Sequence, residues 1–108
     1  MQSVNDRSEA VAFLSHRGEI VFVTDGVLAI SGYDRRELVG KPIFDFFLYR
    51  TKELRAQYES IVAQPNLMVY VVLRMTTKRG QVIRVGLTIR NLLHLPDYRG
   101  VVVILRAL

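Results

Sequence analysis

The sequence predicts an α+β fold: a five-stranded antiparallel sheet with short helices and one longer helix packed on one face. Segments rich in β-branched and aromatic residues group toward the two ends of the 108-residue chain, and the helical patterns lie between them. Strands and helices that segregate in this way are typical of α+β domains. The strand–helix alternation of a doubly wound parallel sheet is missing.

The chain is expected to begin with a polar segment followed by a hairpin. Residues 1–9 are mostly polar, and we place the domain at residues 10–108. Residues 11–15 and 19–24 are rich in strand-forming residues. Between them, Gly18 can adopt the positive φ that a tight turn requires.

Two short helices are predicted after the hairpin. The first covers residues 26–31 and is ended by Gly32. An oxygen of Thr24 or Asp25 can cap its start. The second lies around residues 35–38.

The longest helix is predicted over residues 51–64, after an aromatic-rich stretch at 43–48 that can form a further helical turn. Its apolar residues recur at i, i+4, i+7 and i+8, the spacing of one buried helical stripe. These residues are Leu54, Tyr58, Ile61 and Val62. Pro65 ends the helix.

Three long strands complete the predicted sheet, at residues 67–77, 81–92 and 100–108. Residues 78–80 join the first two through a glycine-bearing hairpin turn. A loop containing Pro96 joins the last two.

Five short features follow one another along the chain. They are the turn glycine Gly18, the pair Gly32-Tyr33, the segment Glu37-Leu38-Val39-Gly40-Lys41, the turn Lys78-Arg79-Gly80-Gln81-Val82-Ile83, and Gly100 at the start of the last strand. In this order and spacing they resemble the PAS domain family, and the resemblance covers residues 10–106. It implies a PAS-like fold and a sensory or dimerisation module of a signal-transduction protein. The implied parent is a sensor histidine kinase, a cyclic-dinucleotide enzyme or a transcription regulator.

Two positions depart from the pattern of the family that the chain resembles. The family often has Asn eight residues before the glycine of its Gly-Tyr pair, where this chain has Thr24. Its last strand often ends in an acidic residue that ties the domain to a following coiled coil, whereas here Arg106 precedes Ala107. The second departure puts a standard output through a C-terminal helix in doubt.

Composition and charge favour a globular cytoplasmic domain. The 15 basic and 10 acidic residues give a net charge of +5, but the basic residues are spread along the chain. Nucleic-acid binding usually needs a dense basic stripe with aromatic partners, so a solvated basic surface is the preferred interpretation. Residues 67–73 form the longest apolar run, which is too short to span a bilayer, and residues 1–7 lack the apolar core of a signal peptide.

No catalytic residue, metal site or cofactor is predicted. Ser15 and His16 are neighbours on a strand and point to opposite faces, so they cannot act as a nucleophile and its base. His16 and His94 are expected at the same end of the sheet, but two imidazoles make a poor metal site even with Asp97 near His94 in sequence. The sequence has no Cys, which excludes disulfides and thiolate ligands.

Two cofactors of the resembled family are considered in turn. Light-sensing flavin domains of that family form an adduct with a Cys, which this chain lacks. Its haem-binding members commonly use a His on the long helix, and residues 51–64 contain none. Tyr58 could ligate haem iron, but packing of its ring in the core stripe is preferred.

The resemblance also implies an interior pocket between the long helix and the sheet. We predict a mostly apolar lining that would suit a small apolar or amphipathic molecule. The candidate pocket residues are Leu28, Tyr33, Leu38, Phe47, Tyr58, Ile61, Val62, Val85 and Leu87. A tightly packed interior without ligand is the alternative, because large rings more often fill a core than frame a cavity.

The outer face of the sheet is predicted to bind a partner. Residues 67–73 and 101–105 are apolar on both strand phases. One apolar face of the sheet packs on the helices, and the other face must be covered by something else. The pattern leaves open which phase faces outward. We assign the partner face to Met68, Tyr70, Val72, Val102 and Ile104. The partner would be a second copy of the chain or another signalling domain, and a ligand-free module acting only through this face is the alternative function.

Overall fold

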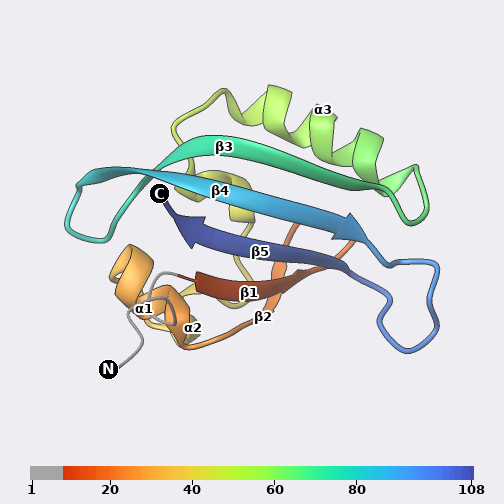
Figure 1. The fold of residues 1–108 in the computed structure, drawn as a ribbon, viewed down its shortest axis with the longest axis horizontal. Helices are drawn as coiled ribbons and strands as arrows, with labels where there is room; N and C mark the ends of the chain where they lie inside the picture. The colour runs from red at the N-terminus through yellow and green to blue at the C-terminus, as the bar shows by residue number, and fades with distance from the viewer. Residues whose placement is uncertain (1–8) are drawn as a thin grey trace.

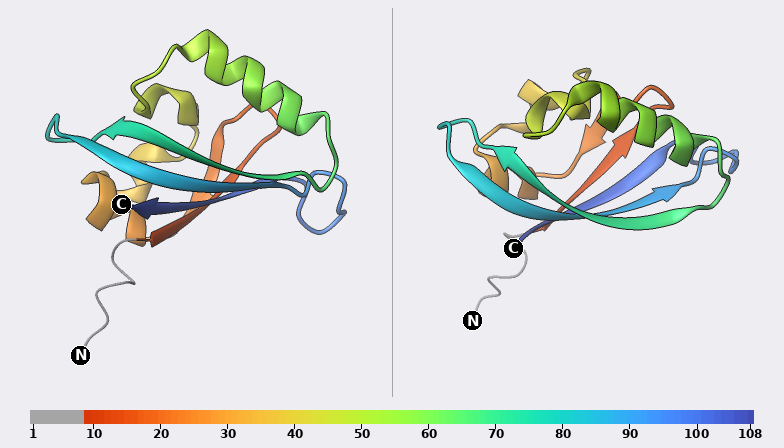
Figure 2. Two further views of the ribbon diagram at one scale, coloured as in Figure 1. Left: turned by 45° about the horizontal axis from the view of Figure 1, so that its top comes forward. Right: turned by 90° about the horizontal axis from the view of Figure 1, so that it is seen from above.

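Residues 9–108 are described by the computed structural model, and they form a curved five-stranded sheet with helices on one of its faces (Figure 1 and Figure 2). The elements in chain order are β1 (Glu9–Leu14), β2 (Ile20–Val23), α1 (Gly26–Ser31), α2 (Arg35–Leu38), the 3₁₀ turn η2 (Ile43–Phe46), α3 (Thr51–Val62), β3 (Met68–Thr76), β4 (Val82–Asn91) and β5 (Val101–Ala107). The strand order across the sheet is β2-β1-β5-β4-β3, and every neighbouring pair is antiparallel. The predicted α+β class and five-stranded sheet are therefore confirmed.

The inner face of the sheet carries the core. One row of directly paired residues crosses four strands, from Ala12 through Val103 and Ile89 to Val69. Val103 and Val85 are almost completely buried there. The helices close this layer with their own apolar residues, among them Leu54 of α3.

The observed element bounds differ from the predicted ones by one or two residues at most ends. Strand β1 begins at Glu9, two residues earlier than predicted, because the strand pairs along its whole length with β5 as far as Glu9 opposite Arg106. Helix α3 ends at Val62, two residues earlier than predicted. Helix α1 covers the predicted residues.

The predicted cap of helix α1 is wrong. Thr24 Oγ1 accepts a hydrogen bond from the Val11 amide at 2.9 Å, so the oxygen is used to hold β1 to the end of β2. Asp25 occupies the N-cap position, but its side chain accepts no hydrogen bond from the helix. At the other end the prediction is confirmed, since the helix ends at Gly32, whose amide donates to the Leu28 carbonyl.

The glycine-bearing turn between β3 and β4 docks on α1 and α2. The Lys78 amide donates to the Ser31 carbonyl at 2.8 Å, and the Lys78 ammonium donates to Glu37 at 2.7 Å. Glu37 also accepts from the Asp34 amide at 2.9 Å, which completes a capping box at the start of α2. The hydrogen bond from Lys78 lowers the pKa of the Glu37 carboxyl.

Helix α3 is attached to the sheet by the buried side chain of Asn91. Its amide nitrogen donates to the carbonyls of Ile61, Val62 and Gln64 at 2.9–3.1 Å. Its oxygen accepts from the Leu93 amide at 2.9 Å. The last carbonyls of a helix have no partner within the helix, so Asn91 satisfies the C-terminus of α3 and fixes its position over β4.

None of the helices within residues 9–108 has the length and apolar character needed to cross a membrane.

Replacing Asn91 with alanine is expected to lower the free energy of unfolding by about 2–4 kcal/mol, because the helix-terminal carbonyls lose their shared donor. Urea denaturation measures this loss. The control is Gln64→Ala, which removes an exposed bond to the Ser60 carbonyl on the same segment and should cost less than about 0.5 kcal/mol. Equal losses for the two variants would contradict the anchoring role of Asn91.

Candidate functional site

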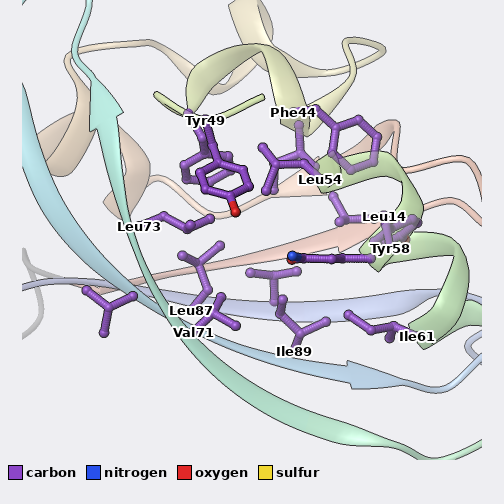
Figure 3. Close-up of a pocket in the computed structure, with 15 residues that line it drawn as sticks. Leu14, Phe44, Tyr49, Leu54, Tyr58, Ile61, Val71, Leu73, Leu87 and Ile89 are labelled. Carbon is purple, nitrogen blue, oxygen red and sulfur yellow. The ribbon is translucent and has the colours of Figure 1, made fainter. Parts of the chain in front are cut away.

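A cavity of about 310 Å³ lies between α3 and the sheet (Figure 3). Leu54 and Tyr58 reach it from α3, and Val71, Leu87 and Ile89 reach it from β3 and β4. Most of its lining is aliphatic or aromatic carbon. Such a surface favours an apolar molecule over a charged one, because a charge would lose its hydration without gaining a partner.

The cavity exists because α3 is held at points that leave β3 incompletely covered. Asn91 fixes the C-terminal end of the helix, as described above. In its middle, the Tyr58 hydroxyl donates to the Ser15 carbonyl at 2.7 Å. Val71 and Leu73 of β3 point to the same side as the core but are only half-buried. The space between them and α3 is the cavity.

Two tyrosine hydroxyls near the cavity have different roles. Burial raises the pKa of Tyr58, so its hydroxyl is a neutral donor that is already engaged by Ser15. The Tyr49 hydroxyl points into the cavity in Figure 3, and within residues 9–108 it has no hydrogen-bond partner. Tyr49 and Gln57 line the cavity and are also exposed, so they stand where it meets solvent. The cavity therefore offers the Tyr49 hydroxyl and the Gln57 amide as hydrogen-bond groups at its mouth, in an otherwise apolar surround.

The structure places the predicted pocket residues in three groups. Phe47, Tyr58, Ile61 and Leu87 line the 310 Å³ cavity. Tyr33 and Leu38, together with Phe47, line a small void of about 40 Å³ beneath α1 and α2. Val85 and Val62 line neither space: Val85 is fully buried in the core, and Val62 lies on the side of α3 toward the β1–β2 turn.

The prediction for Leu28 is corrected, because its side chain is 54% exposed and lines neither space. Helix α1 has only six residues and buries Val27, Ile30 and Ser31, which turns the next position after Val27 to solvent. The sequence reasoning missed the cavity residues Val71, Leu73 and Ile89. The alternation of apolar and polar residues in β4 indicated that Ile89 faces inward. Strand β3 is apolar on both faces, so its sequence could not show that Val71 and Leu73 face inward.

The outer face of the sheet carries an exposed apolar band. Met68 and Tyr70 are 61% and 60% exposed, and Val72 and Ile104 are exposed as well. Val102 is half-buried beside them and pairs directly with Phe13 of β1. All five residues that we assigned to a partner face therefore lie on the outward phase.

Tyr70 lies flat across the outer face. A Cβ atom at Gly86 of β4 would stand 2.3 Å from the Tyr70 hydroxyl oxygen, so the missing side chain is what lets the ring lie over β4. The ring therefore covers Gly86, while the other outward residues of β4, between the apolar residues of β3 and β5, are Arg84, Thr88 and Arg90.

Arginines lie around this band. Arg74 and Arg84 are paired directly opposite each other in the β3–β4 register, on the outward phase. Like charges directly opposite in a sheet repel each other. Arg90 is held by Asn66, and Arg106 is paired with Glu9 across β5 and β1.

No group of three or more His, Asp or Glu side chains gathers as a potential metal site in the described part of the chain. The β1–β2 turn and the β4–β5 loop do lie at the same end of the sheet, since Leu14 pairs with Val101. His16 and His94 thus share that end, as predicted from the topology.

A family model described as the PAS domain matches residues 8–106. No curated protein matches the sequence. Among solved structures, the PAS domain of an HTR-like protein from Haloarcula marismortui is similar, with a TM-score of 0.81 and 19% identity over 93% of this chain and 86% of that chain.

Two further solved structures are similar. One is the PAS-B domain of Drosophila melanogaster Cycle with bound ethylene glycol, with a TM-score of 0.73 and 16% identity over 92% of this chain and 97% of that chain. The other is a domain of a sensory box sensor histidine kinase/response regulator from Geobacter sulfurreducens, with a TM-score of 0.76 and 19% identity over 91% of this chain and 82% of that chain.

Two glycine variants test how tightly the cavity wall is packed. Gly18 and Gly80 have nearly equal φ angles of +83° and +85°. A Cβ at Gly18 would stand 2.4 Å from the Phe44 ring, whereas at Gly80 it would meet nothing within 4 Å. Gly80→Ala should cost about 1–2 kcal/mol from backbone strain alone. Gly18→Ala should cost about 1–3 kcal/mol more, because Phe44 must move. Chemical denaturation measures both, and equal costs would show that the Phe44 contact is unimportant.

Proposed function

Because the chain belongs to the PAS domain family, we propose that it is the sensory module of a cytoplasmic signalling protein and that it takes a small apolar molecule into the cavity under α3. A sensor histidine kinase is the preferred parent, and a cyclic-dinucleotide enzyme or a transcription regulator is the alternative. The description of the Geobacter neighbour as part of a sensor histidine kinase/response regulator supports this preference.

The cavity itself carries the proposal. Its volume of about 310 Å³ lies at the lower end of the range typical of small-molecule sites, and its few polar groups stand at the rim. A ligand with an apolar body and one hydrogen-bond acceptor would bury the body against Leu87 and Ile89 and accept from the Tyr49 hydroxyl. The neighbouring Cycle PAS-B structure holds a small molecule, which is consistent with ligand binding in a fold of this kind.

Signalling would follow from the two sides of the cavity. A ligand there touches α3 and the sheet at once, so it binds most tightly to the position of α3 that closes around it. Differential affinity for two positions of α3 shifts the population between them. The hydrogen bonds of Tyr58 and Asn91 hold the middle and the C-terminal end of α3, so the N-terminal part of the helix would move most.

The proposed module has no catalytic role, no haem and no cysteinyl–flavin adduct. The Tyr58 hydroxyl donates to Ser15, so haem ligation would first have to break that hydrogen bond. The absence of Cys from the sequence removes the thiol that a flavin adduct requires.

A second candidate function is partner binding through the outer face of the sheet. The observation that favours it is the exposed band of Met68, Tyr70, Val72 and Ile104, since contiguous apolar patches often mark interaction sites. The partner would be a second copy of this chain or another signalling domain. If the cavity holds no ligand, this face would be the whole function, and nucleic-acid binding remains the least favoured alternative.

Tyr49→Phe tests the ligand chemistry. Acetophenone carries a carbonyl acceptor, and α-methylstyrene has nearly the same shape without it. The variant should bind acetophenone about fivefold more weakly, as loss of one hydrogen bond implies. Its affinity for α-methylstyrene should stay unchanged. Titration followed by amide chemical shifts measures both.

Tyr98→Phe is the matched control, because Tyr98 is exposed on the β4–β5 loop and contacts Phe13 on the other side of the sheet. It should affect neither probe. Failure of both probes to shift amides of residues 71–73 and 87–89 in the wild-type protein would reject the cavity as a ligand site.

Ile104→Lys tests the outer face. If copies of the chain associate through it, sedimentation should show dimers of the wild-type protein at tens of micromolar. A lysine on the β5 side of the band should weaken them at least about tenfold, because a desolvated charge is costly. Val39→Lys is the control, since Val39 is a similarly exposed residue beside α2. A wild-type protein that stays monomeric would reject self-association.

A further inference from the structure

A second hollow, of about 420 Å³, lies between the β1–β2 turn and α3. Phe44 and Tyr58 line both this hollow and the apolar cavity, so the two rings form the wall between them. The rings pack edge to face with centroids 5.5 Å apart. On the outer side of that wall the chemistry changes, because the lining includes His16, Arg17 and Arg55.

The two arginines come from different elements that a hydrogen bond holds together. Arg17 lies in the β1–β2 turn, where its amide donates to Ser15 Oγ at 3.2 Å. The Ser15 carbonyl accepts from Tyr58 of α3, the helix that carries Arg55. The turn and the helix are therefore tied at the base of the hollow, and their cationic side chains face the same space.

Arg55 is held in place by the wall. Its guanidinium carbon lies 4.8 Å from the centroid of the buried Phe44 ring. This cation–π contact restrains the side chain and leaves its N–H groups free to donate. Restrained guanidinium groups suit the paired oxygens of phosphate and carboxylate.

The positive charge in this hollow is not balanced by its own lining. Within residues 9–108, neither Arg17 nor Arg55 forms a salt bridge. Glu59 is the one acidic residue in the lining, against two arginines. An anion that enters would meet a net positive site with donors from both elements.

We propose that this hollow, which we call the basic hollow and define by His16, Arg17, Arg55 and Glu59, binds the oxyanion of a small molecule, a phosphate or a carboxylate group. The site is separate from the apolar cavity and does not depend on a ligand there. Arg17 and Arg55 would donate to the oxyanion from two sides, and His16 would add a ring N–H. Glu59 would oppose binding at the rim.

Titration with pyrophosphate and with citrate tests the proposal and separates phosphate from carboxylate. Ionic strength is kept constant with sodium chloride, and amide chemical shifts report binding. Arg17→Gln and Arg55→Gln should each weaken binding of the preferred anion at least about fivefold. Arg55→Lys should also weaken it, because an ammonium keeps the charge without the fork of donors. Glu59→Gln should strengthen anion binding about threefold, because the variant removes a negative charge that repels the anion.

Arg79→Gln is the matched control. It makes the same change in net charge in the β3–β4 turn, at the opposite end of the sheet. It should alter affinity by less than about twofold, because screening weakens the effect of so distant a charge. The proposal is overturned if Arg17→Gln and Arg55→Gln weaken binding no more than Arg79→Gln does, or if neither anion at 10 mM shifts the amides of residues 16–18. Equal melting temperatures of the variants would show that altered affinity does not reflect loss of fold.

Discussion

The side-chain amide of Asn91 is the contact on which the arrangement of the helical layer depends. One nitrogen serves three carbonyls at the end of α3, and the oxygen of the same side chain holds the start of the β4–β5 loop. A helix of twelve residues with two well-buried side chains has little apolar contact of its own to fix it. Polar anchoring therefore sets where α3 lies, and apolar packing does not have to fill the space beneath it. That division of roles explains how a cavity of about 310 Å³ can persist in a domain of only about a hundred residues.

The sheet imposes a second constraint, because β3 and β5 are apolar on both faces. Only the inner face is covered by the helices, and Val71 and Leu73 show that even this cover is partial at β3. On the outer face, the missing side chain of Gly86 allows the Tyr70 ring to lie over β4. The arginines around the band oppose a partner of like charge. Arg74 and Arg84 face each other without an acidic neighbour among the salt bridges of residues 9–108. A self-associated form must therefore bring the apolar bands together while keeping these arginine pairs apart.

Local sequence signals predicted the elements well and their contacts poorly. The spacing of glycines and strand-forming residues placed all five strands, and α1 matched residue by residue. Thr24 was expected to cap α1, but its hydroxyl accepts from an amide thirteen residues away that only the folded hairpin brings near. Leu28 was predicted to line the pocket but is exposed, because a six-residue helix is too short for its periodicity to define an inner face. The sequence feature that should have been used is Asn91, a polar residue on the same strand phase as Val85, Leu87 and Ile89. A polar side chain on a buried phase needs partners, and here those partners position the cavity.

Phe44 and Tyr58 separate two environments that select different chemistry. On the cavity side, carbon surfaces penalise any charge that has to shed water. On the other side, Arg17 and Arg55 favour an anion, and the hollow is open to solvent, so the anion keeps part of its hydration. The paired rings and the Tyr58–Ser15 hydrogen bond lie between the two spaces, so we expect the apolar cavity and the basic hollow to bind different molecules. The two proposed sites would respond to two different molecules. Both contact α3, the cavity through Leu54 and Tyr58 and the basic hollow through Arg55 and Tyr58, so occupancy of either would bear on the same helix.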